Sequence, residues 1–125
     1  AFVAQAYIKE APLGDKRVIF VDGKKVGAIN RVPGKQDIRG NLHVGGRAEA
    51  TQLTPKEEEI CQAIGKKLYE RNLFFVGIDL LGGYLTEINV TSPAGVQEVL
   101  ALSGIDIAKI FWQKIEEKLI SRRNF

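Results

Sequence analysis

The sequence predicts an α+β domain in which helices pack on one face of an antiparallel sheet. Apolar, strand-like segments meet at two short turn signals, Asp22-Gly23 and Gly82-Gly83, and such signals are typical of antiparallel hairpins. Segments with apolar residues at helical spacing stand between and after these hairpins. Because strands and helices do not alternate regularly, the order favours α+β over a parallel α/β arrangement.

Composition narrows the class of protein. The 125 residues have the length of one domain or of part of one, and 45% are hydrophobic, as in ordinary globular proteins. The single cysteine, Cys61, excludes an internal disulfide and suits a reducing, cytoplasmic location. No apolar run approaches the ~20 residues of a membrane helix, and the first residues lack the features of a signal peptide. We therefore expect no membrane partner, and the chain, which begins without Met, suggests a fragment.

In the first half, three strands are expected, over Phe2 to Ile8, Lys16 to Asp22 and Lys24 to Val32. A glycine-rich stretch, Pro33 to Arg47, follows without clear structure, and a loop of that length is usually functional or disordered. Its basic residues lack interleaved aromatic residues. This composition suits small anions and argues against nucleic acid as a partner.

Helices dominate the second half. Thr54, Pro55 and Glu57 supply a capping box with proline at the first helical position, so a helix begins there and ends near Asn72. Its predicted buried stripe is Ile60, Ile64 and Leu68. A short helix from Val96 to Leu102 stops at Gly104, and Asp106 caps a last helix to about Arg122. We expect the last helix to pack on the sheet through Ile107, Ile110, Phe111, Ile115 and Leu119.

The stretch from Phe75 to Pro93 reads as a hairpin that carries three oxygen-bearing side chains, and its register decides whether they meet. A two-residue turn would place Ile78 opposite Glu87 and send Asp79 to the other face. A three-residue connection, Gly82 to Tyr84, instead pairs Asp79 with Glu87 and places Asn89 on the same face. Because a slip of one residue reverses a whole strand, the separation of polar from apolar side chains favours the three-residue connection.

Two carboxylates and an amide oxygen on one patch are hard ligands of the kind that Mg²⁺ prefers. Asp79, Glu87 and Asn89 are therefore a candidate metal site; the alternative is a half-exposed hairpin with ordinary surface acids. Arg39 and Arg47 flank a segment rich in backbone N–H groups, which can hold an anion, although a mobile solvated loop would look the same. The small residues after Asn89 lie where a substrate could reach the metal patch.

Four blocks in this order resemble the C-terminal part of the bacterial glutathione synthetases, which are ATP-grasp ligases. They are GDKRV at 14–18, RGNLHVGGR at 39–47, FVGIDLLG at 75–82 and LTEINVTSP at 85–93. The resemblance covers essentially the whole chain and implies the C-terminal portion of an ATP-grasp domain over residues 1–125. The N-terminal domain and the lobe with the nucleotide-binding lysines would then lie outside these residues. His43 and Val44 stand where small residues are common in the family's loop, and Ala48 stands where the family has glycine.

The resemblance implies that ATP drives the joining of γ-glutamylcysteine and glycine to glutathione through an acylphosphate. Asp79, Glu87 and Asn89 would hold Mg²⁺ or Mn²⁺. The residues implied for catalysis are Arg17, Arg39 and Arg47. Those implied for substrate binding are Arg39, Gly40, Asn41, Gly45, Gly46, Arg47, Ser92, Pro93 and Ala94. Those implied for ATP binding are Gln5, Tyr7, Ile8, Asp15 and Arg17.

Two other readings remain open on the sequence. Another ATP-grasp peptide ligase, which adds D-alanine or glutamate, would share the metal and phosphate residues. A non-catalytic module could bind anions or nucleic acid through the basic loop, but it gives no reason for Asp79, Glu87 and Asn89 to share a face. The resemblance also implies small-molecule partners and a homo-oligomer, and this segment alone is expected to be inactive.

Overall fold

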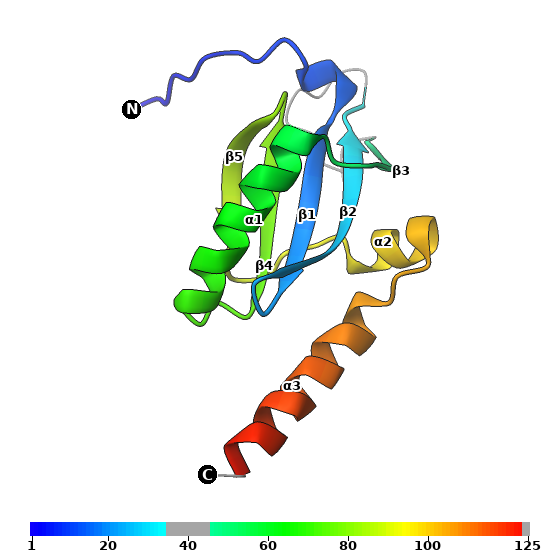
Figure 1. Cartoon of the computed structure of the whole chain (residues 1–125). Helices are drawn as coiled ribbons and strands as arrows, with labels where there is room; N and C mark the ends of the chain where they lie inside the picture. Colours follow the sequence, from blue (N-terminus) through cyan, green and yellow to red (C-terminus); the bar gives the residue numbers. More distant parts are fainter. Residues whose placement is uncertain (35–45, 124–125) are drawn as a thin grey trace.

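The computed structural model describes residues 1–34 and 46–123, which form one five-stranded antiparallel sheet with helices (Figure 1). The strands lie in the order β3-β2-β1-β4-β5. In chain order the elements are a 3₁₀ turn η1 (Ala11–Leu13), β1 (Asp15–Val21), β2 (Lys24–Val32), β3 (Arg47–Ala50), α1 (Pro55–Glu70), β4 (Phe75–Leu81), β5 (Tyr84–Asn89), α2 (Val96–Ser103) and α3 (Ile107–Arg123). Both predicted hairpins are confirmed, and β3 is a strand that the sequence did not reveal.

The predicted first strand, Phe2 to Ile8, is wrong. These residues form an arm without regular structure, and Phe2 and Val3 are 92% and 87% exposed. In Figure 1 the arm runs away from η1 beyond the end of the sheet. An apolar, partly alternating sequence forms a strand only where another strand shares its hydrogen bonds, and among the described residues the arm is not one of the strands of the sheet.

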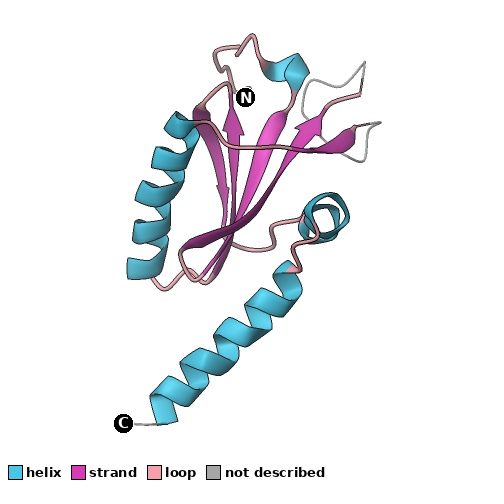
Figure 2. Ribbon diagram, turned by 45° about the vertical axis from the view of Figure 1, so that its right-hand side comes forward, coloured by secondary structure: helices cyan, strands magenta, loops and turns pink. Residues whose placement is uncertain are grey.

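Helices cover both faces of the sheet, not one as expected (Figure 2). Val18 and Phe20 of β1 pack in the core beneath α1, whereas Ile19 and Val21 pack with Val99 of α2 and the first residue of α3. Successive strand residues point to opposite faces, so an unbroken apolar run such as 18–21 needs cover on both sides. The α+β class stands, but the sheet lies between two helical layers.

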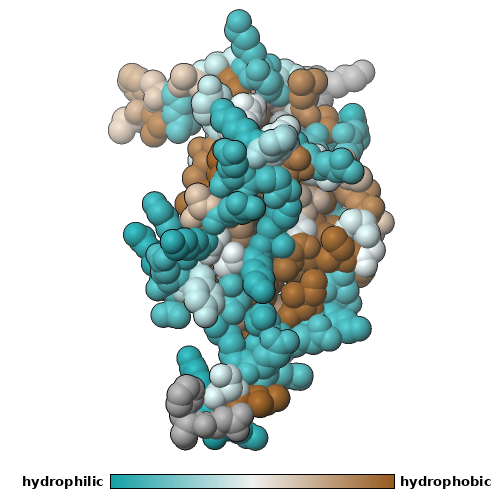
Figure 3. Space-filling view, in the orientation of Figure 1, coloured by the Kyte–Doolittle hydropathy of each residue, from teal (hydrophilic) through white to brown (hydrophobic). Residues whose placement is uncertain are grey.

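Helix α1 begins as predicted. The Thr54 hydroxyl accepts a hydrogen bond from the Glu57 backbone N–H at 3.2 Å, and the Glu57 carboxylate accepts one from the Thr54 N–H at 2.9 Å. Leu68 is buried as expected, and Cys61 and Gly65 are buried beside it. The outward surface of the helix carries mostly charged and polar side chains, such as Lys56, Glu59 and Lys66, and the hydrophilic surface that they contribute to is coloured teal in Figure 3.

Only the start of α3 packs as predicted. Its cap is confirmed, because the Lys109 N–H donates to the Asp106 carboxylate at 3.0 Å. Ile107 is buried, and Phe111 makes edge-on ring contacts with Phe74 and Phe75. Farther along, the helix projects past the sheet, and Leu119 is 55% exposed. None of the helices within the described ranges is long and apolar enough to cross a bilayer.

Candidate functional site

The β4–β5 hairpin brings the three predicted metal ligands to one face. Asp79 pairs with Glu87 and Gly77 pairs with Asn89, as predicted. The predicted three-residue connection is wrong, because Leu81 pairs with Tyr84 across the two-residue turn Gly82-Gly83. Both glycines adopt positive φ angles, 58° and 80°, which suit a tight hairpin turn.

A β-bulge reconciles the tight turn with the predicted pairing. The register shifts between Asp79 and Leu80, and Thr86 is the extra residue of β5. Its hydroxyl donates a hydrogen bond of 3.2 Å to the Asp79 carbonyl. One inserted residue reverses the sidedness of the strand beyond it, so the bulge returns Glu87 to the face of Asp79.

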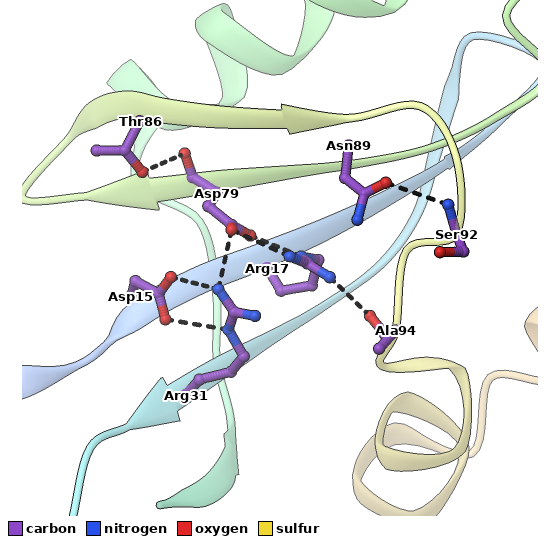
Figure 4. Close-up of polar contacts among 8 residues, drawn as sticks. All are labelled: Asp15, Arg17, Arg31, Asp79, Thr86, Asn89, Ser92 and Ala94. Atoms are coloured by element: carbon purple, nitrogen blue, oxygen red, sulfur yellow. Dashed lines mark hydrogen bonds and ion pairs between the residues drawn. The ribbon is translucent and has the colours of Figure 1, made fainter. Parts of the chain in front are cut away.

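Asp79 is held by Arg17, which projects from the neighbouring strand β1. The Arg17 Nε lies 2.6 Å from one Asp79 carboxylate oxygen, and an Nη lies 3.0 Å from the other (Figure 4). Arg17 is 5% exposed and Asp79 is 4% exposed. A paired arginine and carboxylate of this geometry form a charge-assisted, directional contact. The sequence predicted both residues as site residues but not that they bind each other.

Arg31 of β2 is the residue that the sequence analysis missed. Its Nη2 lies 3.0 Å from an Asp79 carboxylate oxygen, and its Nε donates to Asp15 at 3.0 Å. The same Nη2 also contacts the second Asp15 oxygen. Burial lowers the pKa of Arg31, but the hydrogen bonds that Arg31 donates to Asp15 and Asp79 and the charges of both carboxylates outweigh burial and raise the pKa above its usual value. Asp15, Arg17, Arg31 and Asp79 thus form one array of alternating charges, the arginine–aspartate array.

No simple count along the sequence places Arg31 in this array. The Asp22-Gly23 turn pairs Val21 with Lys24, and counting back from it would set Asn30 opposite Asp15. The β1–β2 register shifts between Ile19 and Phe20, and Asp15 pairs with Arg31 instead. A bulge of this kind depends on contacts that the local sequence does not show.

The segment after β5, with Ser92, Pro93 and Ala94, which are predicted to bind substrate, reaches the array through Ala94. Arg17 donates to the Ala94 carbonyl at 3.1 Å, and the Asn89 side-chain oxygen accepts from the Ser92 N–H at 3.1 Å. Pro93 is buried, and a Cβ added at Gly77 would lie only 2.7 Å from the Pro93 Cβ. Because Gly77 has no side chain, Pro93 can pack against this strand and the segment can approach the array.

The donor chemistry of this face suits a hard divalent cation. Asp79, Glu87 and Asn89 offer two carboxylates and an amide oxygen, a set typical of Mg²⁺ sites that also use substrate phosphates. Glu87 is exposed, whereas Asp79 and Asn89 already accept N–H groups. Among the described residues no group of three or more His, Cys, Asp or Glu side chains could hold a metal, and the predicted set consists of two carboxylates and one amide oxygen.

Three of the predicted nucleotide contacts, Gln5, Tyr7 and Ile8, lie in the described part of the chain but outside the array. Gln5 and Tyr7 lie in the exposed arm, and Ile8 approaches the β4–β5 turn, where a Cβ added at Gly82 would lie 2.9 Å from its side chain. Asp15, predicted to meet the nucleotide, is the exception because it binds Arg31.

Of the segment from Arg39 to Arg47, which is predicted to hold an anion, only Gly46 and Arg47 fall within the described residues. Gly46 directly precedes β3, and Arg47 begins it and donates to Glu49 at 2.9 Å. The register pairs Arg47 with Val32 and Ala48 with Arg31, so Arg47 stands on the opposite face from the array. Four predicted residues lie outside the described ranges: Arg39, Gly40, Asn41 and Gly45.

Solved structures share this fold at low sequence identity. D-alanine–D-alanine ligase from Bacillus anthracis, in complex with ATP, matches 94% of the chain with a TM-score of 0.58 and 19% identity. The match covers 41% of that ligase. The ATP-grasp ligase PsnB matches 74% of the chain with a TM-score of 0.52, also at 19% identity. These likenesses establish the ATP-grasp fold.

Sequence comparison establishes the family. The glutathione synthetases of Mesorhizobium japonicum and Agrobacterium fabrum are 56% and 54% identical to the chain over 117 residues. Each match covers 94% of the chain but 37% of the relative, so the chain spans little more than a third of their length. The family profile of the prokaryotic glutathione synthetase ATP-grasp domain matches residues 1–104. With its sheet, its hairpin and its arginine–aspartate array, the chain belongs to the prokaryotic glutathione synthetase family, within the ATP-grasp domain.

Proposed function

We propose that this chain is the C-terminal portion of the ATP-grasp domain of a ligase that joins γ-glutamylcysteine to glycine, with ATP as co-substrate. The observation that carries the proposal is the buried Arg17–Asp79 pair, which stands beside Glu87 and Asn89 on one sheet face. Identity above one half to glutathione synthetases supports the choice of substrates.

The reaction proposed is activation of the cysteinyl carboxylate as an acylphosphate, followed by attack of the glycine amine and loss of phosphate. Arg17 and Arg31 suit the binding of phosphoryl oxygens because guanidinium groups hold them with paired hydrogen bonds. A divalent cation, Mg²⁺ or Mn²⁺, would be held by Asp79, Glu87 and Asn89 and would supply charge neutralisation on the ATP phosphates. Arg39 would hold the anionic substrate and offset charge that develops on the carbonyl oxygen. The same role is not proposed for Arg47, because Arg47 stands on the opposite face of the sheet from the array.

Small side chains and backbone groups of the chain would position the substrate. Arg17 contacts the carbonyl of Ala94, and Ser92 and Pro93 directly precede Ala94, so a peptide held along this segment would lie beside the array. The loop residues Gly40, Asn41, Gly45 and Gly46 would supply backbone donors and help exclude water from the acylphosphate. For the nucleotide, the proposed contacts are Gln5, Tyr7, Ile8 and Asp15.

The working enzyme is proposed to be a cytoplasmic homo-oligomer that contains a longer polypeptide than residues 1–125. The remaining substrate and nucleotide contacts would come from the rest of that polypeptide. For this reason we expect no glutathione from a protein of 13.8 kDa that has only these residues.

The test combines the intact mass of the purified protein with phosphate release on mixing ATP, Mg²⁺, γ-glutamylcysteine and an acceptor amine. We expect a mass above 13.8 kDa and release that depends on glycine, with glutathione identified as the product. D-alanine and glutamate are the matched acceptors for the related ligases. Release with one of them in place of glycine would refute the glutathione assignment and leave an ATP-grasp ligase of another specificity.

A further inference from the structure

The carboxylate of Asp79 is crowded by two arginines at the place where it is proposed to bind a cation. Three guanidinium N–H groups lie within 3.0 Å of its two oxygens, two from Arg17 and one from Arg31. A carboxylate oxygen that accepts hydrogen bonds has fewer lone pairs for a metal. Here the arginines therefore compete with a divalent cation for the same acceptor.

The balance of charges near this carboxylate also disfavours the binding of a free divalent cation. Asp15, Asp79 and Glu87 carry three negative charges, and Arg17 and Arg31 carry two positive charges, which leaves one net negative charge. Little attraction remains for a free divalent cation. Phosphate groups would change this balance, because they offer the arginines other acceptors.

The two arginines hold Asp79 in different ways. Arg17 uses two nitrogens on two oxygens, whereas Arg31 reaches Asp79 with one nitrogen and is anchored by Asp15 through two. Arg31 can release Asp79 and keep its contacts with Asp15. Its contact with Asp79 is therefore the one that can be broken while the other contacts of the array remain.

We propose that Arg31 is a positioning residue that keeps Asp79 from binding a divalent cation until a phosphate-bearing ligand draws the arginines away. This rests on the proposed function, since it assigns regulation to the same site. The consequence is that cation and phosphate bind together more tightly than either binds alone.

The test measures how tightly Mn²⁺ binds to the protein in the absence of nucleotide. The electron paramagnetic resonance signal of free Mn²⁺ reports how much of the ion remains unbound. Arg31→Gln removes the competing charge, and we expect Mn²⁺ to bind about tenfold or more tightly than to the unaltered protein, because a unit charge within a few ångströms opposes the cation strongly. Arg31→Lys keeps the charge, so its affinity should stay close to that of the unaltered protein. Lys24→Gln, at the far end of the same strand, makes the same change in net charge and should also leave it unchanged.

Arg31→Gln removes one of the two guanidinium charges that Asp79→Asn alone leaves uncompensated. In the folded double variant, Asp79→Asn should abolish the gain, which ties the gain to this carboxylate. Circular dichroism verifies that each variant is folded. Equal Mn²⁺ affinities for the unaltered protein and Arg31→Gln would overturn the proposal, as would an equal gain in Lys24→Gln or a gain that survives Asp79→Asn. Glutathione formation is a separate readout, so this inference can fail while the proposed function stands.

Discussion

The pairing of Arg17 with Asp79 predicts a large and asymmetric effect on stability. Asp79→Asn leaves two arginine side chains facing a neutral amide, and Arg17 among them is 5% exposed. Removing one partner of a buried ion pair costs about 3–5 kcal/mol because the remaining charge is uncompensated. Domains of this size are stable by roughly 5–15 kcal/mol, so the variant should be near its limit of folding.

The matched variant removes both charges. Arg17→Met together with Asp79→Leu exchanges the pair for apolar side chains of similar volume, and such exchanges are often neutral or stabilising. Its free energy of unfolding should therefore exceed that of Asp79→Asn. Glu49→Gln is the control, since it breaks an exposed ion pair with Arg47 and should cost at most about 1 kcal/mol.

Urea unfolding followed by circular dichroism measures all three variants. With a slope of about 1–3 kcal/mol per molar urea, Asp79→Asn should lower the midpoint by about 1 M or more. A loss no larger than that of Glu49→Gln would refute the reasoning. So would a double variant that is no more stable than Asp79→Asn, because the cost would then not come from an uncompensated charge.

Three further predictions concern the helical layer over the other face. Gly65→Ala would place a Cβ 2.3 Å from the Gly23 carbonyl oxygen, and we expect a loss of about 1–3 kcal/mol from overpacking, seen as a lower melting temperature; an unchanged value would mean that α1 can shift. Burial raises the pKa of the Cys61 thiol to about 11, so the folded state loses stability as pH rises from about 8.5, its usual pKa, toward 11. Cys61→Ala should remove that part of the loss in urea titrations at pH 8 and pH 10, and an identical loss in both proteins would contradict it. Burial raises the pKa of Glu57, but hydrogen bonds from Lys16 and Thr54 outweigh burial and lower the pKa. The Glu57 carboxylate therefore stabilises the folded state above its unfolded pKa of about 4.3, and this stabilisation is lost as pH falls through the pKa of the folded state. Glu57→Gln should therefore lower stability at pH 7 more than at pH 3, and equal losses at the two pH values would argue against the assignment.

Local signals in the sequence were sufficient to predict most of the helices and strands. Thr54 and Glu57 specify the start of α1 through contacts three residues apart, and Asp106 caps α3 in the same way. The two glycine-containing turns specify their hairpins. The separation of polar from apolar residues predicted that Asp79 and Glu87 share a face, although the turn that achieves this is shorter than predicted.

The sequence by itself determined the α+β class, the two hairpins, the helix caps and the common face of Asp79, Glu87 and Asn89, because each depends on residues close together in the chain. Only the tertiary structure decided that helices cover both faces, that the first eight residues form no strand, and that Arg31 joins Arg17 and Asp79. Each of these depends on which strands become neighbours and on bulges that shift their register. A register shift of one residue moves a side chain to the other face, and packing between distant segments selects that shift.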